Sequence, residues 1–315
     1  MKPKVTLQIS LAPPDFPHSR HLLIHQLNAF NGQVDEILLT IETRPSKGRF
    51  ATGWSTYETE LYDFIQKDID PRFNIRVLPV DYASSSKKDI SQFFFGKNDI
   101  PDKDFRGGPF YAYFFGLFRA KHDIVIHLDS DMFLGGAGKN WIADALGVFE
   151  KKSGCAVVSP LPGPPHPEEI LVGQNSYERK GHFMFEFQGM STRIFMLDRS
   201  MFSGTKLSLN KPGIKNQIRA VLSGNSNADL PEHIISDFMI RQKQHRIDFL
   251  GSGQGMWSLH PPYRTPEFYH QLPDLIARVE QSNLPPTQYG FYDISDDLFD
   301  WTEAKQNLSR KRWKL

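Results

Sequence analysis

One stretch, residues 122–136, constrains the fold more than any other part of the chain. It reads HDIVIHLDSDMFLGG, a short and mostly apolar run typical of a buried strand, followed by two carboxylates at Asp129 and Asp131. In α/β folds, ligands bind beyond the carboxyl ends of strands, and side chains two positions apart lean to the same side of an extended chain. Asp129 and Asp131 are therefore predicted to lie at the mouth of a binding site.

Two carboxylates held this close repel each other unless a cation lies between them. A hard divalent ion that also carries phosphate oxygens meets this need, and both Mg²⁺ and Mn²⁺ accept such ligands. The alternative for so short a motif is a solvated turn. The motif ends a strand that follows a candidate helix at 111–120, and this context favours the binding site.

The segments around this stretch alternate between strand and helix patterns. Before it, strands are predicted at 5–12, 34–41 and 74–80, and helices at 21–30, 55–67 (with Ser55 or Thr56 as N-cap) and 111–120. After it, strands are predicted at 155–159, on both sides of Gln188-Gly189 within 182–198, and at 246–250, and helices at 231–241 and 274–281. The β-α-β-α-β opening implies right-handed crossovers and a parallel sheet. Residues 83–109 and 251–264 are predicted to be long irregular loops that close over a ligand.

The composition excludes several classes of protein. The 315 residues suit one large α/β domain with extensions or two domains, and 37 basic against 36 acidic residues give no general attraction to nucleic acid. The single cysteine, Cys155, cannot form a disulfide within the chain; it is expected to be a buried, inert thiol, and it favours a reducing compartment. Residues 1–10 are interpreted as a strand and not a signal peptide, and no apolar run is long enough to span a membrane. A cytoplasmic protein is expected.

Taken together, these features resemble the GT-A fold glycosyltransferases, most closely the family 2 type. The likeness spans about residues 4–264 and is carried by the β-α-β opening, by His127-Leu128-Asp129-Ser130-Asp131, by the helix that begins Pro231-Glu232-His233, and by Trp257-Ser258-Leu259-His260. It implies an α/β fold in which a Rossmann-like, mostly parallel central sheet is flanked by helices. It also implies a transferase domain at 1–264, with a nucleotide-binding half at about 1–135 and an acceptor half at 136–264, and a C-terminal extension at 265–315.

The resemblance implies a reaction and a metal site. A sugar moves from a nucleoside-diphosphate sugar to a hydroxyl of a glycan or lipid-linked acceptor, with inversion and with the help of Mn²⁺ or Mg²⁺. Asp131 is expected to bind the metal directly, and Asp129 the metal or the donor ribose. His260 is expected to be a third ligand, which would favour Mn²⁺; the alternative is a structural loop histidine.

Further roles on the donor side follow from the same resemblance. Glu42, after the second strand, lies where such enzymes hold the base or ribose of the nucleotide, and Ala12 and Pro13 are expected against the same nucleotide. Glu42-Thr43-Arg44 replaces the Asp-rich turn usual in the family. Arg264 is expected to contact diphosphate oxygens, because a guanidinium fork suits them; the alternative is a surface arginine.

The acceptor hydroxyl must lose a proton during transfer, and a nearby carboxylate can act as the general base. The resemblance places this base at the start of the late helix, where Glu232 is the first choice and Asp237 the second. The family often has Glu-Asp here, whereas this chain has Glu232-His233. The alternative is that acids in a first helical turn only complement the helix dipole.

Other functions remain open at this stage. A haloacid dehalogenase-type phosphatase would use Asp129 as nucleophile and Asp131 as acid, with 295–300 as its late acidic motif, although that class has its Asp-x-Asp near the first strand. A non-catalytic sugar-binding relative is a further alternative. A nucleotidyltransferase is disfavoured, because 11–16 contains no glycine-rich phosphate loop.

The C-terminal tail, 309–315, contains four cations and Trp313. Such a tail suits weak peripheral contact with an anionic membrane, here the inner face. The alternative is an ordinary helix end, where basic residues complement the dipole.

Overall fold

The computed structural model describes residues 2–45, 53–136 and 138–312, apart from the side chains of 309–312. The strands are β1 Val5–Leu11, β2 Glu36–Ile41, β3 Ile75–Pro79, β4 Ile124–Asp129, β5 Phe133–Gly135, β6 Cys155–Pro162, β7 Tyr177–Gly181, β8 Met184–Phe187, β9 Ile194–Asp198, β10 His245–Phe249 and β11 Trp257–Leu259. The helices are α1 Phe16–Phe30, α2 Trp54–Phe64, α3 Ser84–Phe95, α4 Tyr111–Arg119, α5 Trp141–Lys151, α6 Met201–Gly204, α7 Ile214–Leu222, α8 Pro231–Arg241, α9 Pro266–Glu280 and α10 Thr302–Arg312.

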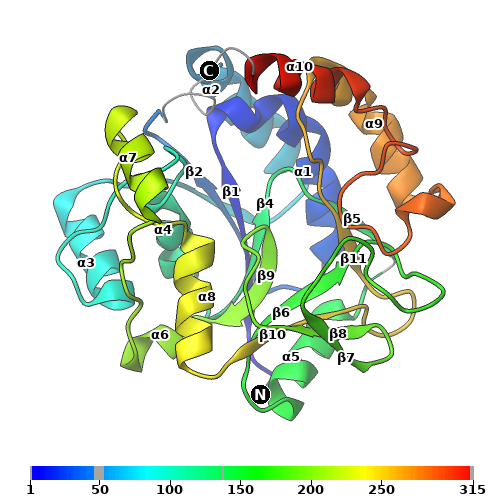
Figure 1. Ribbon diagram of the computed structural model, residues 1–315, viewed down its shortest axis with the longest axis horizontal. Coiled ribbons are helices and arrows are strands. Elements are labelled where there is room, and N and C mark those ends of the chain that lie inside the picture. The colour runs from blue at the N-terminus through cyan, green and yellow to red at the C-terminus, as the bar shows by residue number, and fades with distance from the viewer. Residues whose placement is uncertain (1, 46–52, 137, 313–315) are drawn as a thin grey trace.

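A central sheet runs through the molecule, with α3, α4 and α8 on one side and α1 and α5 on the other (Figure 1). The strand order along its main path is β3-β2-β1-β4-β9-β6-β10-β8-β7. On this path β9 and β8 run antiparallel to their neighbours, and the other strands share one direction. The predicted α/β class, with a mostly parallel central sheet flanked by helices, is therefore confirmed.

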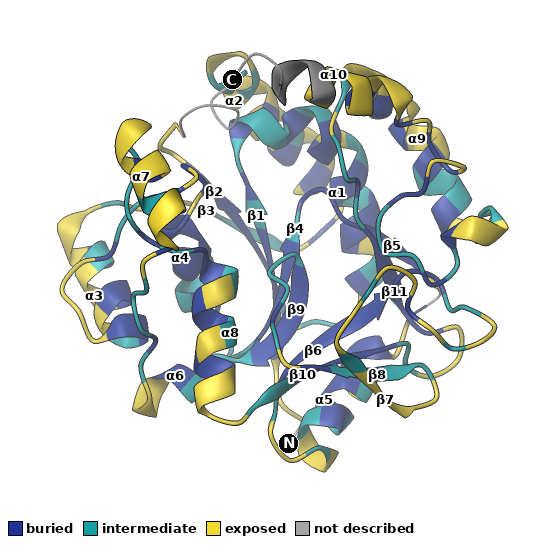
Figure 2. Cartoon of the chain, viewed as in Figure 1, coloured by how far each residue is buried: buried dark blue, intermediate teal, exposed yellow. Residues whose placement is uncertain are grey.

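The first strands separate two apolar cores. Val5, Leu7 and Ile9 of β1 pack with the apolar faces of α1 and α5. On the other face, Leu38 of β2 and Val125 of β4 pack with the aromatic side chains of α3 and α4. This alternation is what a strand with two covered faces requires, because successive side chains point to opposite sides. Figure 2 shows the buried residues following the sheet and the inner faces of the helices.

A third core joins the C-terminal residues to the middle of the chain. Phe268 and Leu272 of α9, together with Trp301, pack against Phe133 of β5 and Trp257 of β11. Trp301 is almost completely buried, and its indole N–H donates to the carbonyl of Ile294 at 2.8 Å. Residues beyond 264 are thus packed into the body that surrounds β5 and β11.

Two segments predicted to be irregular loops contain regular structure, so that part of the prediction is wrong, and their closure over a ligand stays a prediction. Residues 83–109 contain α3, whose buried positions Ile90 and Phe94 lie one helical turn apart within a polar sequence. Residues 251–264 contain β11, which pairs with both β5 and β6. A three-residue strand is too short to show a period in the sequence, and its partners create it.

The boundaries of two elements also differ from prediction. The helix predicted at 55–67 begins at Trp54 after Gly53, which has a φ of 78°, so neither Ser55 nor Thr56 is its N-cap. The strand predicted to end at Ser159 continues as β6 through two prolines to Pro162. On the edge toward β11, the N–H groups of Leu161 and Gly163 donate to the carbonyls of Met256 and Ser258. The nitrogens of the two prolines point to the other edge, where β9 pairs with β6 only at Val157 and Val158, so no ladder bond is lost.

Cys155 is half-buried at the start of β6. Burial raises the pKa of its thiol to about 12. Because the thiolate is the reactive form and a free cysteine has a pKa near 8.5, alkylation by iodoacetamide at pH 8 should be on the order of 10³-fold slower in the folded protein than in urea. Mass spectrometry can follow the alkylation, and equal rates in the folded and the urea-unfolded protein would contradict this expectation.

Candidate functional site

The chain turns sharply where β4 ends, and this turn carries both predicted carboxylates. The N–H of Asp129 donates to the carbonyl of Arg193 at 2.7 Å, which ties the strand end to the segment before β9. From α1, the amide of Gln26 donates to the carbonyls of Asp129 and Met132 at 3.0 and 2.9 Å. The turn is therefore anchored from two sides, and Asp129 keeps 42% of its side chain exposed whereas Asp131 keeps 2%.

Asp129 rests on a buried histidine that the sequence interpretation did not single out. His127 lies between the rings of Tyr113 and Phe195, each 5.1 Å away between centroids. Its Nδ1 contacts the side-chain oxygen of Gln8, and its Nε2 lies 3.3 Å from Oδ1 of Asp129. A chain of polar side chains thus positions the Asp129 carboxylate from within the sheet.

Asp131 is the most deeply buried acid of the site. Its Oδ2 accepts from Nε of Arg264 at 3.1 Å and from Nη2 of the same guanidinium. Its Oδ1 is buried and has no hydrogen-bond partner among the described residues. Burial acts to raise the pKa of Asp131, but the positive charge of Arg264, with smaller effects of His260 and His18, outweighs it and holds the pKa well below the usual value. Asp131 is therefore a carboxylate with one oxygen left for a ligand.

His260 follows β11 and faces Asp131, with its Nε2 3.9 Å from Oδ2. Its Nδ1 lies 2.9 Å from Oδ1 of Asp293, and its N–H and C=O bond the backbone of Tyr292 and Ile294. A carboxylate can only accept, so the proton of a neutral His260 lies on Nδ1, and Nε2 presents its lone pair toward Asp131. Metal-binding histidines are commonly oriented by a carboxylate in this way.

Arg264 is not an isolated surface arginine. Besides Asp131, its charge acts on Asp15, whose pKa is raised to about 6 by burial against the opposing effect of Arg264. Asp15 in turn accepts from the N–H of Ala12 at 2.9 Å. His18 lies behind it, with Nε2 3.0 Å from the Ser130 hydroxyl, and burial lowers its pKa to about 3. Ala12 and the buried Pro13 directly follow β1, so they reach the same edge of the sheet as Asp129.

Glu42 is buried, and its oxygens already have partners. It accepts from the N–H groups of Thr43 and Arg44, from the Tyr82 hydroxyl, and from Nζ of Lys103 at 2.7 Å. A carboxylate with these donors has little capacity left for a ribose hydroxyl. Glu42 therefore organises the turn after β2, and its predicted contact with a nucleotide stays a prediction.

Of the two candidate bases, the structure brings only Glu232 to the site. Its Oε2 lies 3.4 Å from both the N–H and the hydroxyl of Thr192, the residue before Arg193. Burial, then the charges of Asp129 and Glu232, raise the pKa of Tyr113 well above its usual value, so both carboxylates lie near that ring. Asp237 is exposed farther along α8 and accepts from the amide of Asn210.

The three predicted metal ligands do not form a complete metal site by themselves. Within the described part of the chain, no group of three His, Cys, Asp or Glu side chains is arranged to hold a metal ion. Asp131 and His260 face each other, whereas the Asp129 carboxylate is directed to His127. Residues that sequence reasoning missed complete the surroundings: Asp293 behind His260, and Arg193, whose guanidinium lies 3.8 Å from Asp293 and over the ring of Tyr292.

Comparisons with known proteins give a limited result. No family model matches the chain, and no curated protein sequence matches it. Among solved structures, glucosyl-3-phosphoglycerate synthase from Mycobacterium tuberculosis, in complex with Mn²⁺, uridine diphosphate and glucosyl-3-phosphoglycerate, is 13% identical; the match covers 90% of this chain and 81% of that chain, with a TM-score of 0.40. The structure of the same enzyme with Mg²⁺ and uridine diphosphate is also 13% identical. That match covers 90% of this chain and 81% of that chain, with a TM-score of 0.39.

A further solved structure, described as that of a mycobacterial protein, is 12% identical, with 88% of this chain and 73% of that chain covered and a TM-score of 0.41. Identities and superposition scores this low leave the function to be argued from the site itself.

Proposed function

We propose that this protein is a metal-dependent GT-A glycosyltransferase that moves a sugar from a nucleoside-diphosphate sugar to a hydroxyl of a glycan or lipid-linked acceptor. The observation that carries the proposal is Oδ1 of Asp131, which is buried at the end of the central strand and has no partner among the described residues. Nε2 of His260 lies 3.9 Å from Oδ2 of the same carboxylate. A buried carboxylate oxygen without a donor is costly, and a cation removes that cost.

The residues present fit a divalent cation. Asp131 through Oδ1 and His260 through Nε2 would hold it, and Asp129 would contact either the ion or the donor ribose. Two or three protein ligands leave coordination positions for phosphate oxygens, as Mg²⁺ and Mn²⁺ sites for nucleotides usually do, and the imidazole favours Mn²⁺. When bound, such an ion neutralises charge on the departing nucleoside diphosphate.

Arg264 would help to stabilise the departing nucleoside diphosphate. Its guanidinium has five N–H donors in a planar fork, and those on Nε and Nη2 face Asp131. The remaining N–H groups can donate to diphosphate oxygens, which the geometry of a guanidinium suits. On the nucleotide side, Ala12 and Pro13 would lie against the donor, and Glu42 would act by holding Lys103 and Tyr82 in place.

Glu232 is the proposed general base. Both of its contacts with Thr192 are long, at 3.4 Å, so the carboxylate is weakly engaged and can accept a proton from an acceptor hydroxyl. Glu232 comes from α8, whereas Arg264 lies just before α9, so the proposed base and the proposed diphosphate contact come from different elements. Inversion of the anomeric configuration is the expected outcome.

The phosphatase alternative is not favoured by the surroundings of its acids. Asp296 pairs with Lys305, Asp297 accepts from Thr287, and Asp300 accepts from the N–H of Thr302. The late acidic motif of that hypothesis is therefore engaged in local contacts within the C-terminal segment.

A ligand screen tests the proposal. The midpoint temperature of thermal unfolding should rise when a nucleoside diphosphate and Mn²⁺ are added together. A ligand at a hundred times its dissociation constant stabilises the folded state by about 2.7 kcal/mol. Hydrolysis of nucleotide sugars in the presence of Mn²⁺, with no hydrolysis of an aryl phosphate, is expected. Hydrolysis of the aryl phosphate without hydrolysis of nucleotide sugars would favour a phosphatase over the transferase. The absence of both a thermal shift and turnover would favour a non-catalytic relative.

Asp293 gives a second test, at the metal. Replacing it with alanine removes the acceptor that orients His260, and loss of such a partner typically weakens metal affinity by about 10- to 100-fold. Binding of Mn²⁺ can be followed by the electron paramagnetic resonance signal of the free ion, without any turnover. Asp296→Ala, in the same segment but paired with exposed Lys305, is the matched control. Equal affinity in the Asp293→Ala variant and the wild type would show that His260 does not need this carboxylate.

A further inference from the structure

Helix α7 exposes the side that a surface helix normally buries. Ile214, Ile218, Val221 and Leu222 are 78%, 58%, 65% and 83% exposed. Ala220, on the opposite side, is completely buried. A helix of a globular protein usually directs its apolar stripe to the core. In α7 the apolar stripe lies among the exposed positions, and Figure 2 shows most of the helix as exposed.

The helix is nevertheless held firmly against the body of the protein. Ala220 packs with Phe105 and Leu230 in a small apolar cluster. The amide of Asn225 donates to the carbonyl of Phe105 at 3.2 Å, and the N–H of Phe105 donates to the carbonyl of Ala228 at 2.9 Å. The exposed apolar stripe therefore belongs to a helix that is packed against the rest of the protein.

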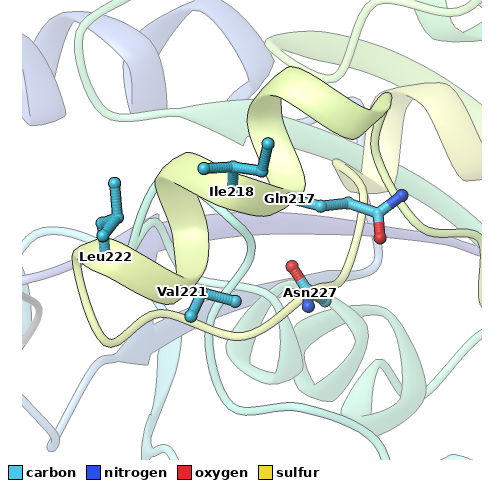
Figure 3. A pocket seen from close by; sticks show the side chains of 5 residues that line it. All are labelled: Gln217, Ile218, Val221, Leu222 and Asn227. Carbon is cyan, nitrogen blue, oxygen red and sulfur yellow. The ribbon is translucent and has the colours of Figure 1, made fainter.

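A shallow hollow of about 280 Å³ lies along α7 and the residues that follow it (Figure 3). Gln217, Ile218, Val221, Leu222 and Asn227 line it. The lining combines three aliphatic side chains with two amides, so the stripe and the hollow form one surface that is mainly apolar.

The charges beside this stripe have one sign. Lys211, Lys215 and Arg219 are exposed, and none of the three is paired with an acid of the described residues. From Lys206 to Ala228 the sequence contains no aspartate or glutamate. Lys215 and Arg219 lie four positions apart, so they share one edge of the helix, next to the apolar stripe.

The position of α7 relates it to the candidate site. The segment that contacts α7 through Phe105 also carries Lys103, which pairs with Glu42 directly after β2. Helix α7 is thus attached to the edge of the sheet at which the parallel strands end and the proposed donor residues gather.

We propose that α7 docks on an anionic lipid surface, with Ile214, Ile218, Val221 and Leu222 in the interface and the three cations toward the headgroups. A narrow apolar stripe bordered by basic side chains is the pattern of helices that lie in a membrane surface. Charge complementarity selects the anionic lipid. The described residues contain no helix that is long and apolar enough to cross a bilayer.

A second copy of the chain is a poorer occupant. A helix of nine residues is about 13 Å long. A stable dimer needs roughly 800 Å² from each partner, which a single helix face of this length does not provide. Two such faces packed together would also bring the basic side chains of both copies close to each other, and like charges repel.

Co-sedimentation with vesicles tests the proposal on the full chain. Wild-type protein should partition to phosphatidylcholine vesicles containing phosphatidylglycerol, more at low than at physiological salt, and weakly to phosphatidylcholine alone. The Ile218→Asp/Leu222→Asp and Lys215→Glu/Arg219→Glu variants should each lose about tenfold or more in partition coefficient. Ile240→Asp is the matched control, because Ile240 is 56% exposed on α8.

Two further arms distinguish α7 from the C-terminal tail and from a self-association surface. A chain ending at Asn307 should bind as the full chain does; loss of binding there, with the α7 variants unaffected, would assign the contact to the tail and overturn the proposal. Sedimentation velocity without lipid should show a monomer, and a dimer abolished by Ile218→Asp/Leu222→Asp would make α7 a contact between copies instead.

Circular dichroism confirms that the variants fold. Donor hydrolysis in solution should be unchanged in them, so membrane docking can fail without affecting the proposed function.

Discussion

Asp131→Asn should reduce transfer by about 10³-fold or more, because a metal contributes several kcal/mol to stabilising the leaving group and each 1.36 kcal/mol is a factor of ten in rate. The substitution keeps the shape of the side chain and removes the charge that both the cation and Arg264 require. The same variant should lose the Mn²⁺-dependent part of the thermal shift produced by nucleoside diphosphates. Initial rates and melting curves, each with and without Mn²⁺, measure the two effects.

The control for this substitution lies beyond the opposite end of β4. Asp123 precedes β4 at its other end, is exposed and pairs with Arg199. Asp123→Asn should therefore retain activity and the metal-dependent shift. Arg264 keeps 43% of its side chain exposed, so water can solvate its charge and Asp131→Asn should still fold. A folded Asp131→Asn variant with full activity would end the proposal of a metal-dependent transferase.

Glu232→Gln is the second substitution with a large expected effect. It preserves volume and removes the proton acceptor, and a positioned general base typically contributes about 10²- to 10⁴-fold in rate. The loss should appear in the transfer rate, while donor binding with Mn²⁺, measured by thermal shift, stays near that of the wild type. The anomeric configuration of the wild-type product, determined by NMR, checks the expected inversion.

Asp237→Asn is the matched control on the same helix. Asp237 is exposed and bonded to Asn210, so this variant should stay near wild-type activity. If Asp237→Asn is inactive while Glu232→Gln is active, then α8 must present its outer face to the acceptor, and the assignment of the base is reversed. If both variants are active, the base lies elsewhere in the site.

Local patterns determined the framework of this protein. The parallel opening, the aromatic helix α4, the proline-initiated helix α8 and the strand that ends at Asp129 follow from periodicity and from residues that begin or end helices and strands. Each of these signals lies within a few neighbouring positions of the chain. The sequence alone therefore also placed Asp129 and Asp131 at the carboxyl end of a central strand, where α/β proteins bind ligands.

Contacts between distant residues decided the rest. Asp131 meets Arg264 across 133 positions, and His260 meets Asp293 across 33. Lys103 and Tyr82 engage Glu42, and Asn210 engages Asp237, through neighbours that no spacing rule connects. The amphipathic pattern of α7 would place its apolar stripe inward, but Ala220 is the residue that packs against Phe105. Which oxygen of Asp131 lacks a partner among the described residues, and which helix face lacks a cover, depends on the packing of segments far apart in sequence, so only the tertiary structure decides them.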